Sequence, residues 1–323
     1  MSRSYCVRRW LVALGLAFVA AGILEAQQQK QFEPQVGQAG KDVVWVPTPQ
    51  VLVEKMLDMA KVTPQDYVID LGSGDGRTVI TAAKRGARAL GIEYNPDMVD
   101  LSRRNAAEAG VGEKVTFVKA DLFESDFSQA TVITMFLLPE INLKLRPKLL
   151  DMKPGTRVAS NSFTMDEWEA DETVTVEEGC TSWCTAYLWI VPAKVEGTWR
   201  LAQGELTLKQ DFQMISGTLA SGGSKTPISG KLTGDQIRFS AGDAQYTGHV
   251  DGNTMSGTTK SGTGNGTWNA TRVTKGIGAV SPKSKIRIVA APVGVSDVIN
   301  NFCWCVPTRL EVILERVCTN EPR

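Results

Sequence analysis

The stretch Val68-Ile69-Asp70-Leu71-Gly72-Ser73-Gly74-Asp75-Gly76 decides the fold, because an apolar run typical of a buried strand leads into three glycines at alternate positions. Glycines let the backbone turn sharply and bring its amides against a ligand. A dinucleotide-binding fingerprint would need its third glycine at position 77, where the chain has Arg77. No Gly-Lys-Ser/Thr follows either, so a Walker loop is excluded. The stretch therefore predicts a strand, a glycine turn and a helix that hold a ligand of another class.

Short β-branched or aromatic runs on both sides of this stretch alternate with segments whose apolar residues repeat at helical spacing. Strands joined by helices are typical of a parallel sheet covered on both faces. We therefore expect an α/β fold with a doubly wound, mainly parallel seven-stranded sheet. The expected strands are residues 67–71, 89–93, 115–120, 132–137, 157–163, 174–177 and 186–191, and the expected helices are residues 51–60, 77–84, 97–109 and 141–150.

The pattern changes after Pro192. Residues 197–273 hold 14 of the chain's 30 glycines and show period-two segments without a helical repeat. Gly-Asp and Asp-Gly turns separate these segments, which is typical of antiparallel hairpins. We expect a small antiparallel all-β domain, built as a meander. Its clearest strands are residues 228–232, 236–240, 244–250 and 254–258.

Length and composition bound the organisation and the chemistry. The 323 residues suggest two domains, and the balance of 35 basic against 35 acidic side chains gives no support to a nucleic-acid partner. His249 is the single histidine, which excludes most Ser-His and Cys-His catalytic arrangements, and we predict no metal. The expected parts are a signal peptide or membrane anchor (1–26), a linker (27–43), a ligand-binding α/β domain (44–193), a glycine-rich β domain (194–274) and a linker with an irregular tail (275–323).

The first residues have the pattern of an export signal. Three arginines within residues 1–9 precede the uncharged run 10–24, which is short for a membrane span. Ala26 is the expected cleavage point. An uncleaved anchor that associates with the membrane through residues 10–24 is the alternative. We therefore expect an exported, periplasmic or membrane-anchored protein.

The pairs Cys180/Cys184 and Cys303/Cys305 lack nearby histidines and do not match zinc spacing. We expect free or buried thiols, or a disulfide if the protein is exported. Tryptophans are more often core or domain-interface residues than parts of a ligand cage. We interpret Trp183, Trp189, Trp199 and Trp268 in this way.

The run Asp70-x-Gly-x-Gly-x-Gly resembles the S-adenosylmethionine loop of class I, Rossmann-like methyltransferases. Glu93 ends the second expected strand, where that class has an acid on the ribose hydroxyls. Asp121 follows the third, where the class contacts the adenine amine. The resemblance implies S-adenosyl-L-methionine as cofactor, with Asp70 anchoring the loop or the methionine amino group. The implied cofactor-binding residues are Asp70, Gly72, Ser73, Gly74, Asp75, Gly76, Glu93, Tyr94, Asp121 and Leu122.

Four further runs, 46–49, 136–142, 145–150 and 154–160, resemble one family within this class. They look like bacterial relatives of the mitochondrial lysine methyltransferases that modify the ATP synthase c-subunit and the adenine nucleotide translocase. The resemblance covers residues 44–192 and implies a histidine after Ser160. This chain has Asn161 there, which preserves a polar contact but not a titrating one.

The implied reaction is in-line transfer of a methyl group from a sulfonium to a nucleophile. The expected nucleophile is the amine of a protein lysine. Because the leaving group is already activated, the protein mainly positions the reactants. Phe136, Leu137 and Pro139, after the fourth expected strand, are predicted to form an apolar acceptor slot that favours the neutral amine. Glu140 and Asn142 are predicted to orient that amine, with a helix-start acid and a helix cap as their alternatives.

Two other functions stay open. The same fold could methylate a small molecule instead of a protein. In a different class, the chain could be an envelope binding protein whose β domain binds and whose Rossmann-like domain is catalytically idle. Export itself conflicts with a methyl donor that is made in the cytosol.

Overall fold

The computed structural model describes residues 32–262 and 264–273. The predicted signal or anchor, the Cys303/Cys305 pair and the irregular tail lie outside these ranges. No helix within them is long and apolar enough to cross a membrane.

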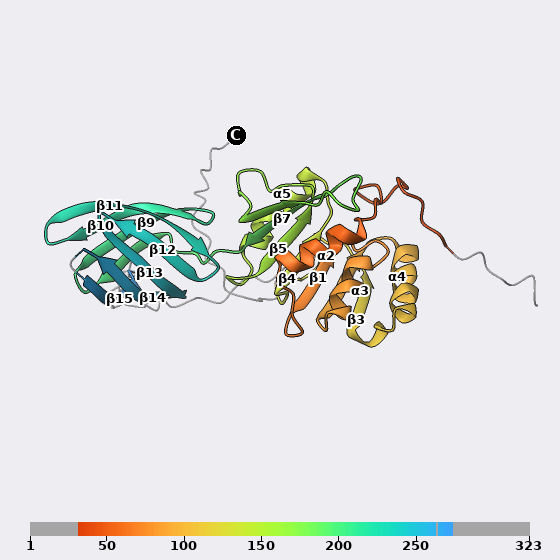
Figure 1. The fold of residues 1–323 in the computed structure, drawn as a ribbon, viewed down its shortest axis with the longest axis horizontal. Coiled ribbons are helices and arrows are strands. Elements are labelled where there is room, and N and C mark those ends of the chain that lie inside the picture. The colour runs from red at the N-terminus through yellow and green to blue at the C-terminus, as the bar shows by residue number, and fades with distance from the viewer. Residues whose placement is uncertain (1–31, 263, 274–323) are drawn as a thin grey trace, which may run out of the picture. The chain divides into compact units, whose positions relative to one another are not determined.

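A seven-stranded sheet organises the first half of the described chain (Figure 1). Its strands are β1 Tyr67–Leu71, β2 Arg88–Glu93, β3 Val115–Lys119, β4 Val132–Met135, β5 Arg157–Asn161, β6 Glu172–Thr175 and β7 Thr185–Ile190. The spatial order is β3-β2-β1-β4-β5-β7-β6, with β1 to β5 parallel and β7 antiparallel to both of its neighbours. The predicted mainly parallel, seven-stranded α/β sheet is confirmed. The strand order reverses between β1 and β4, and such a switch point opens a crevice at the carboxyl ends of the strands.

Four helices cover the sheet: α2 Gln50–Met59, α3 Arg77–Lys84, α4 Pro96–Glu108 and α5 Pro139–Leu150. Successive residues of a strand point to opposite faces. In β1, Val68 belongs to the buried cluster that α2, α3 and α4 form on one face. Ile69 and Leu71 belong to the cluster that contains α5. Both faces are therefore buried, which explains why β1 is an almost continuous apolar run.

An ion pair fastens the amino-terminal edge of the sheet. Asp66 accepts hydrogen bonds from Thr131 Oγ1 at 2.7 Å and from the Thr63 amide at 2.8 Å, and it pairs with Arg157. Burial raises the pKa of Asp66, but these hydrogen bonds outweigh burial and hold its pKa below the usual range. The carboxylate thus stabilises the fold at neutral pH, and that contribution is lost as the pH falls through the lowered pKa.

Replacing Asp66 with alanine should lower the free energy of unfolding by about 3 kcal/mol, because it leaves Arg157 without its buried partner. Asp58→Ala is the matched control, since Asp58 also pairs with an arginine but its side chain is 60% exposed. Exposed pairs contribute roughly 0–1 kcal/mol. Urea denaturation at pH 7 measures both, and equal losses for the two variants would contradict the assignment.

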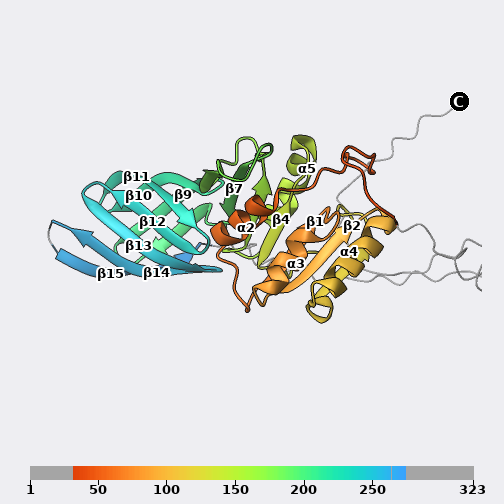
Figure 2. The ribbon, with the colours of Figure 1, turned by 45° about the vertical axis from the view of Figure 1, so that its right-hand side comes forward.

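Eight antiparallel strands form a closed barrel after Pro192 (Figures 1 and 2). They are β8 Gly197–Leu201, β9 Gly204–Asp211, β10 Met214–Ser221, β11 Ser224–Thr233, β12 Gln236–Ala241, β13 Ala244–Asp251, β14 Thr254–Ser261 and β15 Gly264–Arg272. Side chains fill the interior, where the Phe239 and Tyr246 rings stack at 4.6 Å and Trp268 meets both edge-on. The predicted antiparallel all-β fold is confirmed.

The predicted meander is confirmed, because consecutive strands pair with one another, but its closure into a barrel was not predicted. The four predicted strands lie within β11 to β14, but β15 also pairs with β8, with Ala270 opposite Leu201. Closure removes the two unpaired edges that an open meander would leave. It depends on pairing between distant segments, which the local alternation does not reveal.

Candidate active site

The carboxyl ends of β1 to β4 and the loops after them line a cavity of about 200 Å³ at the switch point of the sheet. Nine of the ten predicted cofactor residues lie in its lining; the exception is Gly76. Residues 38–48, before α2, line it as well, and no sequence signal predicted their part. The structure thus brings the separate sequence signals into one site.

The glycine turn is packed closely on the side away from the cavity. Gly76 precedes α3 with φ +83°, and a Cβ there would lie 2.8 Å from Phe117 Cζ and 2.9 Å from Ser102 Cβ. Ser102 Oγ also donates to the Gly74 carbonyl at 2.8 Å. Gly76 therefore lets the turn pack against Phe117 and Ser102, on the side that faces away from the cavity. This position accounts for its absence from the cavity lining.

Glu93 holds the turn through both carboxylate oxygens. Oε2 accepts a hydrogen bond from the Gly74 amide at 3.0 Å, and Oε1 accepts one from the Asn95 amide at 2.9 Å. Each oxygen keeps a further acceptor site. Glu93 can therefore fix the loop and receive two vicinal hydroxyl groups at the same time.

Asp70 is buried at the end of β1, where Thr134 Oγ1 donates to its Oδ1 at 2.7 Å. Burial, helped by the charges of Asp75 and Glu93, raises the pKa of Asp70 to about 7, although the Thr134 hydrogen bond acts to lower it. Within the described chain, no basic side chain forms an ion pair with Asp70. A cationic ligand group would supply the missing partner.

Asp121 follows β3 and pairs with Lys41 from the segment before α2. The hydrogen bond from Lys41 and one of 2.9 Å from the Phe123 amide hold the pKa of Asp121 below its usual range. Lys41 Nζ also lies 4.9 Å from the centroid of the Tyr94 ring. A base amine that binds Asp121 would share this carboxylate with Lys41.

Asp75 does not present a free carboxylate to the cavity. Arg77 Nε contacts its two oxygens at 3.0 and 3.1 Å, and Arg77 Nη1 donates to the Thr48 carbonyl at 3.0 Å. The pair ties the glycine turn to the segment that leads into α2. Asp75 is thus a loop residue that positions this segment.

A second group of lining residues is apolar and aromatic. Phe136 and Leu137 follow β4 as predicted, Phe163 follows β5, and Trp183 lies in the loop between β6 and β7. The three ring centroids are 5.6 to 6.0 Å apart. Phe163 could have been found from its place beyond the end of a parallel strand. Nothing in the local pattern pointed to Trp183.

The core interpretation of Trp183 is wrong, because this side chain is 44% exposed and lines the cavity. Trp189, Trp199 and Trp268 are buried, as predicted. Trp183 differs because a short loop, and not a strand facing the core, carries it.

Three predicted acceptor residues do not line the cavity: Pro139, Glu140 and Asn142. Pro139 and Glu140 lie in the first turn of α5, so Glu140 matches the alternative of a helix-start acid. Asn142 is fully buried, and its Nδ2 donates to the carbonyls of Phe163 and Thr164 at 3.3 and 3.2 Å. It thus supports the backbone that carries Phe163 instead of facing the acceptor.

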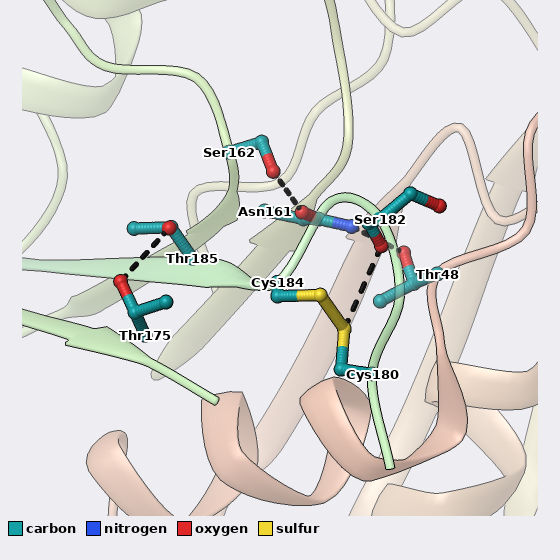
Figure 3. The surroundings of a disulfide bond; sticks show 8 residues. All are labelled: Thr48, Asn161, Ser162, Thr175, Cys180, Ser182, Cys184 and Thr185. Atoms are coloured by element: carbon teal, nitrogen blue, oxygen red, sulfur yellow. Dashed lines mark hydrogen bonds between the residues drawn. A yellow bond between two sulfur atoms is a disulfide. The ribbon is translucent and has the colours of Figure 1, made fainter. Parts of the chain in front are cut away.

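Figure 3 shows Asn161 and the disulfide beside it. Asn161 is buried, donates to Thr48 Oγ1 at 3.2 Å and accepts from Ser162 Oγ at 2.7 Å. The residue at this departure from the family pattern therefore links the end of β5 to the segment before α2. Cys180 and Cys184 form a disulfide, so the second of the two predicted cysteine states, a disulfide instead of free or buried thiols, is the one present.

The residues present fit S-adenosylmethionine. Ser73 Oγ is buried without a hydrogen-bond partner among the described residues, so a polar ligand group would satisfy it. The lining is also more acidic than basic, which suits the sulfonium and ammonium groups of that molecule. Its charged residues are Asp42, Asp70, Asp75, Glu93 and Asp121 against Lys41 and Arg77.

Comparison with known proteins agrees with this geometry. A family model described as the ANTKMT methyltransferase domain matches residues 70–172. A protein-lysine N-methyltransferase of Saccharolobus islandicus is 44% identical over 152 residues, which cover 46% of this chain and 94% of that protein. The ATP synthase c-subunit lysine N-methyltransferase of Mus musculus is 37% identical over 40% of this chain, which spans about half (52%) of that relative's length.

One solved structure is 49% identical, covers 46% of this chain and 96% of that chain, and has a TM-score of 0.44. It is an RNA methyltransferase from Salinibacter ruber in complex with S-adenosyl-L-homocysteine. The predicted methyltransferase activity and the predicted family are confirmed. S-adenosylmethionine, the predicted cofactor, is the methyl donor of this class of enzyme. The chain belongs to the ANTKMT methyltransferase family.

Proposed function

We propose that this enzyme binds S-adenosylmethionine in the cavity beside the glycine turn and transfers its methyl group to a lysine amine of a protein. The observation that carries the proposal is one cavity with two kinds of lining, acidic around the turn and aromatic around Phe136. The 44% identical protein-lysine N-methyltransferase supports the choice of acceptor.

The acidic lining would hold the donor by three contacts. Glu93 would accept a hydrogen bond from each of the two ribose hydroxyls. Its oxygens have lone pairs left for this, beyond those that bind the Gly74 and Asn95 amides. Asp121 would accept a hydrogen bond from the adenine amine, and Leu122 and Tyr94 would lie beside the adenine ring. The buried charge of Asp70 would attract the methionine ammonium.

When bound, the donor supplies an activated methyl group on a sulfonium. The lysine nitrogen forms the new N–C bond as the S–C bond breaks, which leaves a neutral thioether and a methylammonium on the acceptor. The attacking amine must therefore be neutral. Phe136, Leu137 and Phe163 favour that form, because an apolar environment destabilises the ammonium. The chain's own contribution is alignment and exclusion of water.

We also propose that this enzyme is a bacterial protein that acts outside the cytosol. The basic, then apolar, start of the chain motivates this location, and the Cys180–Cys184 disulfide is consistent with an oxidising compartment. The donor would have to reach that compartment or meet the enzyme before export. Fractionation with amino-terminal sequencing of the mature protein distinguishes export, anchoring through residues 10–24 and a cytosolic location.

Calorimetry with S-adenosylhomocysteine and the full chain tests the donor, with micromolar binding expected. Incubation of a cell lysate with methyl-labelled donor and the enzyme then tests the acceptor. We expect label on protein lysines by mass spectrometry. Label confined to small molecules or to RNA overturns the lysine acceptor. Binding without transfer to any fraction would instead favour the alternative of a catalytically idle domain.

A further inference from the structure

Trp183 is far more exposed than the tryptophans that pack in the cores of the sheet and the barrel. Its indole is 44% exposed, whereas the side chains of Trp168, Trp189 and Trp199 are fully buried. Leaving so large an apolar group in water is unfavourable, so an exposed indole at a cavity marks a contact surface. Its ring lies 5.7 Å from Phe136 and 5.6 Å from Phe163, both of which also line the cavity.

A disulfide bond constrains the loop that carries Trp183. The Cys180–Cys184 disulfide closes a loop of only a few residues around Trp183, which itself has a left-handed backbone with φ +57°. Directly beyond the disulfide, the chain enters β7, and the Thr175 and Thr185 hydroxyls are hydrogen-bonded across β6 and β7 at 3.0 Å (Figure 3). A non-glycine residue in this conformation needs support from its surroundings. The disulfide supplies that support.

The chemistry of this aromatic wall, defined as Phe136, Phe163 and Trp183, suits a lysine side chain. Aromatic faces attract an ammonium, and they also pack against the methylene stem of a lysine. None of the charged residues in the cavity lining belongs to the three loops that carry the wall. The amine can therefore arrive as a cation on the ring faces and release its proton to water before it reaches the methyl group, since no acid belongs to this part of the lining.

We propose that Trp183 is a specificity-determining residue that binds the acceptor lysine, and that the Cys180–Cys184 disulfide is the positioning element that holds it there. This inference rests on the proposed lysine methyltransferase function. It adds a requirement that the donor site does not have. Acceptor recognition depends on an oxidised disulfide, whereas donor binding does not.

The first test compares Trp183→Ala and Trp183→Phe with the wild-type full chain on the lysate protein fraction, at saturating labelled donor. We expect the apparent KM for the acceptor fraction to rise at least tenfold in Trp183→Ala and no more than threefold in Trp183→Phe. The affinity for S-adenosylhomocysteine and the Tm should stay unchanged. Met214→Ala, which removes a half-exposed side chain from the barrel, is the matched control and should behave as wild type.

The second test concerns the disulfide. A dithiol reduces it with two electrons and two protons, which yields two cysteine thiols and the oxidised dithiol. Dithiothreitol should raise the acceptor KM of the wild type severalfold. It should have no further effect on Trp183→Ala or on the double variant Cys180→Ser/Cys184→Ser, which should already show the raised KM.

The outcomes separate this inference from the proposed function. If the wild type binds S-adenosylhomocysteine and labels protein lysines while Trp183→Ala keeps the wild-type KM, the function stands and this inference is overturned. If Trp183→Ala loses donor affinity or folded protein together with activity, a structural role replaces the proposed one. If the wild type labels no protein, both proposals fall.

Discussion

Asp70→Asn should bind S-adenosylhomocysteine ten- to a hundredfold more weakly than the wild type at pH 8, although the apoprotein becomes more stable. The carboxylate is buried without a cation, so its charge is available to the ligand's ammonium. A hydrogen bond to a charged group contributes about 1.5–3 kcal/mol, and each 1.4 kcal/mol is roughly tenfold in affinity. Asparagine keeps the acceptor for Thr134 but loses the charge.

The same substitution predicts how stability depends on pH. The pKa of Asp70 is raised from 3.8 to about 7 in the folded state. Below pH 3.8, burial of Asp70 therefore does not lower the free energy of unfolding of the wild type. As the pH rises through 7, the buried carboxyl must ionise and that free energy falls. Asp70→Asn should match the wild type near pH 4 and exceed its unfolding free energy by on the order of 2 kcal/mol at pH 8.

Two measurements check this expectation. Calorimetric titration with S-adenosylhomocysteine from pH 6 to 8 should show affinity rising for the wild type and flat for Asp70→Asn, and urea denaturation should give the stability crossover. Asp126→Asn, an acid outside the cavity lining, is the control and should leave ligand affinity unchanged. Unaltered binding by Asp70→Asn would remove Asp70 from the donor site.

Glu93→Ala should lower donor affinity more than a hundredfold. The change removes the acceptor for the ribose hydroxyls and also releases the Gly74 and Asn95 amides, so the glycine turn loses its fixed shape. Glu93→Gln should be nearly as weak, because one amide N–H then meets the NH₂ group of glutamine instead of an acceptor. Two lost contacts of about 1.5–3 kcal/mol each account for the size of the effect.

Equilibrium binding of S-adenosylhomocysteine measures both variants, and kcat/KM should fall in parallel. The control is Glu124→Ala, an exposed acid near the same edge of the sheet that lies outside the cavity lining. If Glu93→Ala bound within threefold of the wild type, the ribose contact would have to lie elsewhere.

The α/β half was predictable because its signals are local. The central parallel strands β1 and β4 are short runs buried on both faces, and Asp70, Glu93 and Asp121 lie near the carboxyl ends of β1, β2 and β3 or directly after them. Parallel strands bring their carboxyl ends to one edge. The order of strand ends along the chain is therefore sufficient to predict that these three acids share one cavity.

The parts that were not predicted depend on contacts between distant segments. Lys41 reaches Asp121 across 80 positions of the sequence, and nothing near Lys41 indicates an acid partner. Trp183 faces the cavity only because a disulfide and the pairing of β6 with β7 place its loop there. Asn142 looked like an amine-orienting residue because of its place after β4, yet it turns inward to the Phe163 carbonyl.

The closure of the barrel has a consequence for how the chain is made. β8 is the first of its strands to be synthesised, but one of its two edges stays unpaired until β15, the last strand, has left the ribosome. During that interval β8 exposes a row of free N–H and C=O groups that a neighbouring chain could pair with. Translation that stopped before Gly264 would leave the released protein with open edges on both β8 and β14, and so prone to associate with other chains.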